Sequence, residues 1–182
     1  MDNTQIVKFS MYEMEYKGGV TESNLPLILF KEKYYEQYKK LIDDCFYEMR
    51  EALNIRPYEK HSNSLVEPKR LKENTYLLLN DEEIIGVFSF FENEIGNVAV
   101  NSKYRRQGYG RKLIELALSN MQKRRVSPII LTVAKWNKNA IALYKSLGFE
   151  IAKETIVEGV STKDTAGNWT FEFTSTGGLA LR

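Results

Sequence analysis

The sequence predicts a single α+β domain in which helices flank a mixed, mostly antiparallel sheet. Apolar residues dominate two adjacent segments, 76–79 and 84–91, which predicts a β-hairpin around the polar turn 80–83. From 31 to 54 the apolar residues recur with helical spacing. Between 98 and 133 a strand, a tight turn, a helix and a second strand follow one another, which predicts a right-handed β-α-β unit with parallel strands.

Size and composition exclude several classes of protein. The chain has 182 residues, of which 43% are hydrophobic, and this suits one domain over 1–182. A net charge of +2 argues against strong nonspecific binding of nucleic acid. The single cysteine, Cys45, excludes an internal disulfide, and one histidine with one cysteine cannot build a His/Cys metal site. No apolar run has the length of a membrane span and segment 1–5 does not open a signal peptide, so we expect a cytoplasmic protein without a metal.

The elements before the β-α-β unit are predicted from the spacing of apolar residues and from the glycine and proline residues that end each element. An alternating strand covers 6–16 and ends at Gly18-Gly19. The helix at 31–54 is closed by Arg56-Pro57. The polar segment 58–74 is expected to hold a loop and a short helix, and the hairpin leads into a third strand that ends at Val100.

The second half of the chain continues the alternation of helix and strand. The expected elements are a helix at 109–125, a strand at 129–133, a helix at 137–147, and strands near 149–156 and 169–174. Asn137 is a suitable N-cap and Gly148 a suitable left-handed C-terminal residue for the helix between them. We expect a polar connection at 157–168 and a mobile end at 175–182.

The segment with the most chemical information is the basic turn Arg105-x-x-Gly108-x-Gly110, which lies between a strand and a helix. Glycine permits positive φ and close approach of the backbone to a ligand. The amides at a helix start are unpaired donors in the positive end of the helix dipole, so the turn has the features of a phosphate site. It is neither a dinucleotide fingerprint nor a P-loop. Taken alone, it is equally compatible with an ordinary tight turn that carries solvated arginines.

Two motifs together resemble the GNAT superfamily of N-acetyltransferases. The first is the turn itself, preceded by Val98-Ala99-Val100, and it resembles the coenzyme A signature of that superfamily. The second is Asn137-Lys138-Asn139-Ala140-Ile141-Ala142-Leu143-Tyr144-Lys145-Ser146-Leu147-Gly148-Phe149, which resembles the later motif Asn-x-x-Ala-x-x-x-Tyr-x-x-x-Gly-Phe. The resemblance implies an α/β/α-layered GNAT-like domain with a splayed parallel strand pair, a coenzyme-binding core at about 75–150 and acceptor-side elements at about 31–74.

The resemblance also implies which residues bind acetyl-coenzyme A. The backbone amides expected to hold the pyrophosphate are those of Gln107, Gly108, Tyr109, Gly110 and Arg111. Lys103, Arg105 or Arg106 would reach the remaining phosphate. The pantetheine arm would lie along Val98, Ala99 and Val100, whose amides would polarise the thioester carbonyl as in an oxyanion hole.

Tyr144 occupies the tyrosine position of the later motif, which implies a proton donor to the leaving thiolate. A tyrosine hydroxyl has an unperturbed pKa of about 10, above that of a thiol at about 8.5. By spacing alone, Tyr144 lies on the apolar stripe of its helix and would be a core residue. Asn137 has a similar ambiguity, since it is an N-cap by position and a pantetheine contact by resemblance.

Glu94 is the candidate general base, because it lies just ahead of the strand that enters the site, where members of the superfamily place a carboxylate. Glu92 is the second candidate, on the same face if the strand continues. Surface charges at a turn, with a water chain as the base, are the alternative for both.

The acceptor is the least determined part of the sequence. The helix at 31–54 and the following loop would border it, through Tyr47, Arg50, Glu51, Arg56, Tyr58, Glu59 and His61. The sequence-based hypothesis is an N-acetyltransferase that acts on a primary amine of a small molecule. A protein N-terminus or lysine is the alternative acceptor, and a non-catalytic coenzyme A-binding regulator is the alternative of another class. The expected partners are acetyl-coenzyme A and the amine, with no nucleic acid or membrane; a homodimer is compatible with the sequence.

Overall fold

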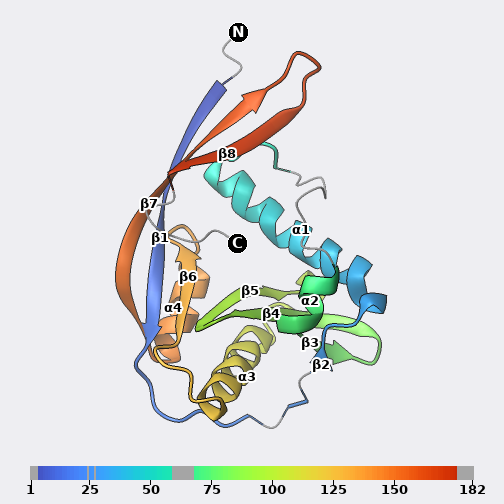
Figure 1. The fold of residues 1–182 in the computed structure, drawn as a ribbon, viewed down its shortest axis with the longest axis vertical. Helices are drawn as coiled ribbons and strands as arrows, with labels where there is room; N and C mark the ends of the chain where they lie inside the picture. Colours follow the sequence, from blue (N-terminus) through green and yellow to red (C-terminus); the bar gives the residue numbers. More distant parts are fainter. Residues whose placement is uncertain (1–3, 24, 27, 59–67, 176–182) are drawn as a thin grey trace.

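The computed structural model describes residues 4–23, 25–26, 28–58 and 68–175. The strands are β1 (Thr4–Tyr16), β2 (Ile28–Leu29), β3 (Thr75–Asn80), β4 (Glu83–Phe91), β5 (Glu94–Val100), β6 (Ile130–Ala134), β7 (Phe149–Lys163) and β8 (Trp169–Ser175). The helices are α1 (Tyr35–Leu53), α2 (Pro68–Asn74), α3 (Tyr109–Lys123) and α4 (Lys138–Ser146), with 3-10 turns at Glu32–Tyr34 and Ser102–Tyr104. Figure 1 shows their arrangement.

The strands form one sheet of eight in the order β2-β3-β4-β5-β6-β1-β7-β8. Only the central neighbours β5 and β6 are parallel, and all other neighbours are antiparallel. The parallel pair has a single register pair, Glu94 with Ile130, at the start of both strands. The carboxyl ends of β5 and β6 therefore separate, and this confirms the predicted mixed sheet with a splayed parallel pair.

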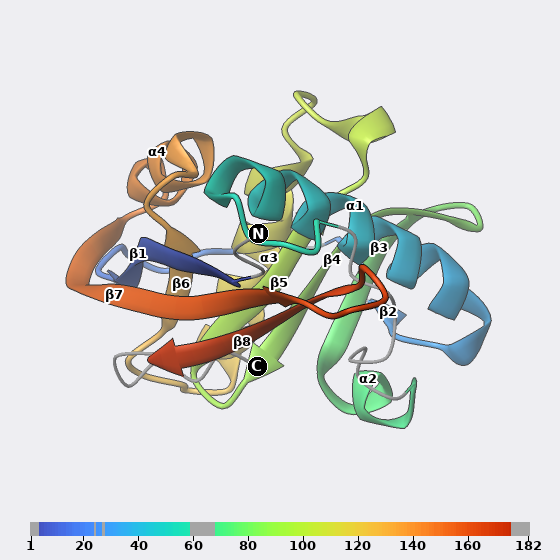
Figure 2. The same ribbon diagram turned by 90° about the horizontal axis from the view of Figure 1, so that it is seen from above.

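Helices cover both faces of the sheet, as the predicted α/β/α layering requires. On one face α1 packs Leu41 and Ile42 into a core with Val87 and Ala99 of the sheet. On the other face α3 and α4 belong to a larger core that contains Phe88 and the buried side of α3. Figure 2 shows α1 and α4 lying at different positions across the sheet. Because successive residues of a strand point to opposite faces, neighbours such as Val87 and Phe88 serve different cores.

The first strand takes a place that its sequence did not specify. β1 lies between β6 and β7, pairing Met11 with Ala134 on one side and with Thr155 on the other. The N-terminal segment therefore supplies an inner strand of the half of the sheet that carries the C-terminal part of the chain. Pairing on both edges agrees with its burial pattern, in which Val7, Met11 and Met14 are buried.

Several predicted boundaries were wrong. β7 does not end near 156 but continues to Lys163, and the turn to β8 is limited to 164–168. The polar residues of this stretch alternate with inward-facing ones, because Val157 and Ser161 are buried while their neighbours are not. The short strand β2 was not predicted, α1 begins after a 3-10 turn, and α3 ends at Lys123 rather than at 125. The end expected to be mobile lies almost entirely outside the described residues.

Candidate functional site

The start of α3 has the free donors that anion binding requires. Gly108 precedes the helix with φ 83° and ψ 0°, in the left-handed region, and no side chain caps the helix. The amide of Lys112 donates to the carbonyl of Gly108 over 3.2 Å. The amides of Tyr109, Gly110 and Arg111 precede this first bond and have no acceptor within the helix. They point out of the helix start, where the helix dipole is positive.

The two glycines of the turn serve different purposes. A Cβ atom at Gly108 would meet nothing within 4 Å, so the space above this residue is open. Glycine is favoured at this position by the positive φ, and no described atom fills the space above it. A Cβ atom at Gly110 would lie 3.3 Å from Cδ2 of Leu143, so this glycine lets α3 pack closely against α4. The turn thereby fixes the distance between the helix start and the helix that carries Tyr144.

The basic side chains of the turn are mostly engaged elsewhere. Arg105 donates from Nε to the carbonyl of Val100 over 3.2 Å, pairs with Glu48 of α1, and donates to Sγ of Cys45 over 3.6 Å. Lys103 pairs with Glu83 over 2.7 Å. Arg105 and Lys103 were predicted to reach a phosphate, but in this structure they tie the turn to its protein neighbours.

Arg106 and Arg111 are the remaining cations of the turn. Arg106 is exposed, has a φ of 61°, and makes no ion pair with any residue in the described ranges. Arg111 donates to Oγ of Ser146 over 2.7 Å and lies 3.7 Å from Glu115. Its side chain therefore also links α3 to the end of α4. The side chain of Gln107 donates from Nε2 to the carbonyl of Lys103 and therefore folds back onto the turn.

A β-bulge shapes the end of β5. Val87 pairs with Ala99 and Ser89 with Gly96, so that Phe88 faces both Asn97 and Val98. Asn97 has a φ of 51°. A bulge bends its strand and redirects its backbone, and here it lies where β5 leaves β6. The sequence carried no signal for it beyond the asparagine, a residue that tolerates positive φ.

The residues Val98, Ala99 and Val100 follow the bulge. Ala99 is buried beneath α1, whereas Val98 and Val100 are half-buried against the core on the α3 side. Their ladder partners lie on β4, and β6 has already diverged from this part of β5. Within the described ranges, the β6-facing edge of this segment thus has no strand partner, as the splayed geometry predicts.

Tyr144 is a core residue by burial. Its exposed fraction is 8%, and its ring lies 6.0 Å from that of Phe149. Burial raises the pKa of Tyr144 to about 12. No hydrogen bond of its hydroxyl is formed with the described residues. The structural role predicted from spacing is therefore confirmed, and the catalytic role remains a prediction that the burial does not contradict.

Asn137 is the N-cap of α4, as predicted, because its Oδ1 accepts a hydrogen bond from the amide of Ala140 over 3.1 Å. The backbone amide of Asn137 donates to the carbonyl of Ala134 at the end of β6. The side chain therefore fixes the helix start, and its contact with pantetheine stays a prediction.

Glu94 joins the two parallel strands at the closed end of the splay. Its Oε1 accepts a hydrogen bond from the hydroxyl of Thr132 on β6 over 2.8 Å. Thr132 was not among the predicted site residues, because nothing in the sequence aligns two strands that are joined through a helix. Glu92 does not lie on the strand. It is exposed in the β4–β5 turn with a φ of 57°, so the expectation that it shares a face with Glu94 was wrong.

The predicted acceptor-side residues do not form a single group, and Glu51 is linked to Tyr47, whose hydroxyl lies 3.5 Å from Oε1 of Glu51. Tyr47, Arg56 and Tyr58 line a pocket of about 340 Å³ together with Pro57, Gly167, Asn168 and Trp169. Arg50 is structural, since its Nη1 donates to the carbonyl of Pro57 over 2.6 Å. Glu59 and His61 lie outside the described residues. Sequence reasoning missed Trp169, which only the β7–β8 turn brings to α1.

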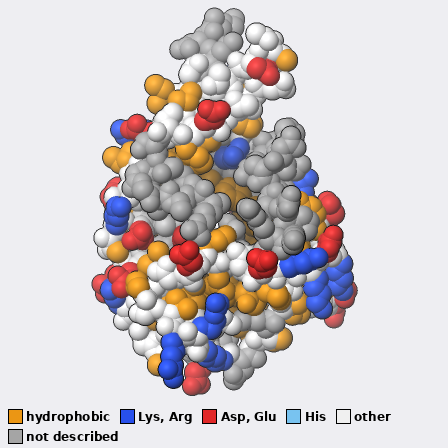
Figure 3. All heavy atoms as spheres, in the orientation of Figure 1, with side chains coloured by type: hydrophobic (Ala, Val, Ile, Leu, Met, Phe, Trp, Pro, Cys, Tyr) orange, Lys and Arg blue, Asp and Glu red, His pale blue; other side chains and the backbone are white. Residues whose placement is uncertain are grey.

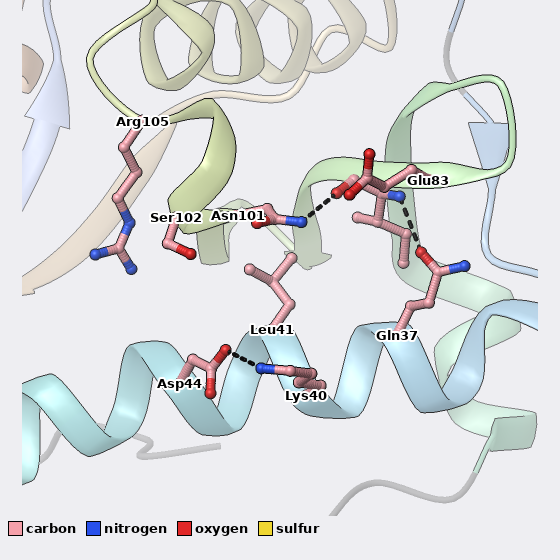
Figure 4. Close-up of a pocket in the computed structure, with 9 residues that line it drawn as sticks. Gln37, Lys40, Leu41, Asp44, Glu83, Asn101, Ser102 and Arg105 are labelled. Carbon is pink, nitrogen blue, oxygen red and sulfur yellow. Dashed lines mark hydrogen bonds and ion pairs between the residues drawn. The ribbon is translucent and has the colours of Figure 1, made fainter.

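A second pocket, of about 320 Å³, lies between α1 and the segment after β5 (Figure 4). Arg105 and Asp44 line it from opposite sides. Asp44 pairs with Lys40 along the helix over 2.8 Å, and the side chain of Asn101 donates from Nδ2 to the carbonyl of Ile84 over 3.1 Å. Most of its polar groups are thus already satisfied by protein partners.

The described part of the chain contains no group of three or more His, Cys, Asp or Glu residues that could hold a metal. None of the helices within those residues is long and apolar enough to cross a membrane.

Comparison with known families agrees with the geometry. The acetyltransferase (GNAT) family matches residues 35–149. The [ribosomal protein bS18]-alanine N-acetyltransferase of Escherichia coli is 46% identical over 61 residues, which cover 34% of this chain and 41% of that protein. The mycothiol acetyltransferase of Corynebacterium glutamicum is 35% identical over 92 residues, or 47% of this chain and 32% of that protein. The chain thus spans less than half the length of these relatives.

Solved structures share the fold at low sequence identity. An acetyltransferase of the GNAT family from Novosphingobium aromaticivorans superposes with a TM-score of 0.62 at 20% identity, covering 90% of this chain and 69% of that one. A transcriptional regulator from Bacillus halodurans gives a TM-score of 0.55 at 24% identity, covering 72% of this chain and 97% of that one. These similarities confirm the fold and leave the acceptor open.

Proposed function

Because the chain belongs to the GNAT acetyltransferase family, we propose that it transfers an acetyl group from acetyl-coenzyme A to a primary amine of a small molecule in the cytoplasm. The observation that carries this proposal is the pairing of two features. One is the helix start at Gly108, with free amides beneath open space. The other is the separation of β5 from β6, which leaves a strand edge beside that helix start.

The coenzyme is held mainly by backbone groups in this proposal. The amides from Gln107 to Arg111 would bind the pyrophosphate, because they are unpaired donors at the positive end of a helix dipole. Arg106 is the cation left to reach a further phosphate. The amides of Val98 to Val100 would hold the arm and polarise the thioester carbonyl.

Acetyl transfer needs two movements of protons besides the exchange of bonds. The amine must lose a proton before its nitrogen attacks the thioester carbon, and the new C–N bond then replaces the C–S bond. We assign Glu94 as the acceptor of the amine proton, directly or through water. Its carboxylate is half-buried at the closed end of the splay, and Thr132 orients one oxygen over 2.8 Å.

Tyr144 acts on the leaving thiolate in this proposal. Its pKa of about 12 keeps the phenol protonated at neutral pH, so the hydroxyl is available as a donor. Full proton transfer to a thiolate whose conjugate acid has a pKa of about 8.5 would be uphill. The role supported by burial is therefore a hydrogen bond that stabilises the thiolate as the C–S bond breaks, with later protonation from solvent.

A second candidate is acetylation of a protein N-terminus or lysine. The similarity to a ribosomal-protein alanine acetyltransferase supports it, and the similarity to a mycothiol acetyltransferase supports a small acceptor. A coenzyme A-binding regulator without catalysis is the third. The presence of both Tyr144 and Glu94 favours an enzyme over this third candidate.

The test has two steps. Calorimetric titration with acetyl-coenzyme A should detect binding at submillimolar concentration, and no binding there would refute all three candidates. A panel of small amines and peptides with free N-termini is then screened by the release of free thiol. Turnover with small amines supports the proposal, turnover with peptides alone supports the second candidate, and binding without any turnover supports the third.

A further inference from the structure

The pocket beside the end of α1 contains a stacked arginine. The guanidinium carbon of Arg56 lies 5.1 Å from the ring centroid of Tyr58 and 5.4 Å from that of Trp169. Tyr47 adds a third ring, 6.2 Å from that of Tyr58. Aromatic faces attract a guanidinium and restrict its plane, so the edge that carries the N–H donors is presented in a fixed orientation.

The backbone of Arg56 is held as firmly as its side chain. Its amide donates to Oγ of Ser161 on β7 over 3.1 Å, and the hydroxyl of Ser161 donates back to the carbonyl of Arg56 over 2.7 Å. Ser161 is fully buried. This clamp joins the loop after α1 to the β7–β8 arm, which projects beyond the body of the domain in Figure 1.

The charge of Arg56 is not used by the described protein. Arg56 makes no ion pair and no side-chain hydrogen bond with any residue in the described ranges. Asp164, an acidic group in the turn of the arm, accepts two hydrogen bonds from Asn168, at 2.8 and 3.0 Å. Lys163 adds a second positive charge, 5.9 Å from the Trp169 ring. The pocket is therefore cationic and aromatic at the same time.

Packing links the end of α1, just before the pocket, to the carboxyl end of β6, which borders the open end of the splay. Leu53, at the end of α1, packs against the cluster of Met11, Ala134 and Val157, where β6 ends. Arg56 follows directly after this contact in the chain. In Figure 3 hydrophobic and basic side chains are exposed between the projecting arm and the body of the domain.

Given the proposed acetyl transfer, we infer that this pocket recognises a carboxylate on the acceptor, and that the acceptor is an amine with an aromatic or other planar body. Arg56 would bind both carboxylate oxygens through two parallel N–H donors. The rings of Tyr47 and Trp169 would flank the planar body. A volume of about 340 Å³ lies within the range of small-ligand pockets and holds one ring with its substituents.

The test of recognition uses two probes that differ only in charge, 4-(aminomethyl)benzoate and 4-(aminomethyl)benzamide. Binding is followed by the fluorescence of Trp169 in a Trp136→Phe background, without acetyl-coenzyme A. The benzoate should bind at least about tenfold more tightly than the benzamide, because only the benzoate forms a charge-assisted bidentate pair. Equal affinities for the two probes would overturn the inference.

Variants assign that preference to one side chain. Arg56→Met should weaken the benzoate about tenfold and abolish the difference between the probes, and Arg56→Lys should retain part of it because lysine keeps the charge without the planar fork. The matched control is Arg124→Met, which removes an arginine that lies over the Phe90 ring at the end of α3. A preference that survives both Arg56 variants would overturn the inference, and so would one that is lost in Arg124→Met.

Acetyl transfer is then measured with the same probes, so that the two proposals can fail separately. Binding that depends on Arg56, without thiol release from any amine, would refute the acetyl transfer and leave the carboxylate site supported. Thiol release with equal kcat/KM for both probes, and no effect of Arg56→Met, would leave the acetyl transfer supported and refute the carboxylate site.

Discussion

The two sides of the candidate site are built in different ways. The proposed coenzyme side uses two neighbouring stretches of the chain, 98–100 at the end of β5 and 105–111 at the start of α3, and its proposed donors are backbone amides. The proposed acceptor side is a pocket that combines residues 47–58 with 167–169, which lie far apart in the chain, and its proposed recognition groups are side chains. A local segment can be identified from the sequence because its geometry depends on its own residues. An assembled pocket exists only when the fold brings its parts together.

Positive charge has opposite meanings on the two sides. The turn at Lys103–Arg111 is the most basic segment of the chain, yet Lys103 and Arg105 are paired with Glu83 and Glu48. On the acceptor side Arg56 is an isolated cation in sequence and has no acidic partner among the described residues. The density of charge in a sequence therefore does not indicate which cation is available to a ligand.

The largest effect is expected at Tyr144, which α4 holds in the core it shares with α3. Tyr144→Phe should lower kcat for acetyl transfer about 100-fold, as for loss of a positioned hydrogen-bond donor to the developing thiolate, and leave the stability nearly unchanged. Free thiol release with a working amine measures the rate. The matched control is Tyr38→Phe, since Tyr38 is also buried and its pKa is also raised to about 12, but it lies on α1. Equal rates in Tyr144→Phe and the parent protein would remove the hydroxyl from the mechanism.

The coenzyme side is tested alone by Gly108→Val. A side chain with φ near 83° is strained by about 1–2 kcal/mol and would occupy the open space above the turn. The affinity for coenzyme A should fall at least about tenfold, measured by calorimetry. Gly167→Val is the control, because Gly167 also has a positive φ, 92°, and lies on the acceptor side. Similar losses of coenzyme A affinity in both variants would mean that strain, and not the cradle, causes the effect.

The loss of stability at alkaline pH tests the burial of one tyrosine on α4, Tyr144, and of one on α1, Tyr38. Burial raises the pKa of Tyr144 and of Tyr38 from 10.0 to about 12, with a smaller contribution to Tyr38 from Tyr35. The folded protein therefore binds more protons than the unfolded chain between pH 10 and pH 12. The free energy of unfolding should be insensitive to these groups below pH 10 and should then fall by about 1.4 kcal/mol per pH unit for each tyrosine.

Denaturant titrations at pH 9, 10 and 11 measure this loss. Tyr144→Phe and Tyr38→Phe should each remove the share of one tyrosine from the pH dependence. An unchanged slope in Tyr38→Phe would show that the hydroxyl on the α1 side is not buried in solution.

The smallest effect is expected from Arg105→Met. Since the guanidinium binds Val100, Glu48 and Cys45, its loss should lower stability by about 1 kcal/mol and change coenzyme A affinity less than about threefold. Calorimetric titration and a thermal melt measure the two quantities. Arg106→Met is the comparison, and it should weaken coenzyme A more than Arg105→Met does. The reverse order would restore Arg105 as the phosphate contact.

The sequence by itself determined the local features of this protein. The glycine at 108, the N-cap at Asn137 and the positive φ of Gly148 are set by short-range sterics and hydrogen bonds, and the structure has all three. The hairpin β3–β4 and the helices α3 and α4 also follow from periodicity within single segments. The mixed sheet was predicted from the hairpin and the β-α-β unit, and its splayed parallel pair through the resemblance of two such local motifs to a known family.

Only the tertiary structure decided which distant groups meet. It inserted β1 between β6 and β7, aligned Thr132 with Glu94 across two strands, and brought Trp169 to Arg56. It also paired Arg105, the first residue of the coenzyme A signature, with Glu48, so that this arginine ties the turn to α1. Pairing between strands and side chains of large separation depends on the packing of the whole domain, and no window of the sequence contains both partners.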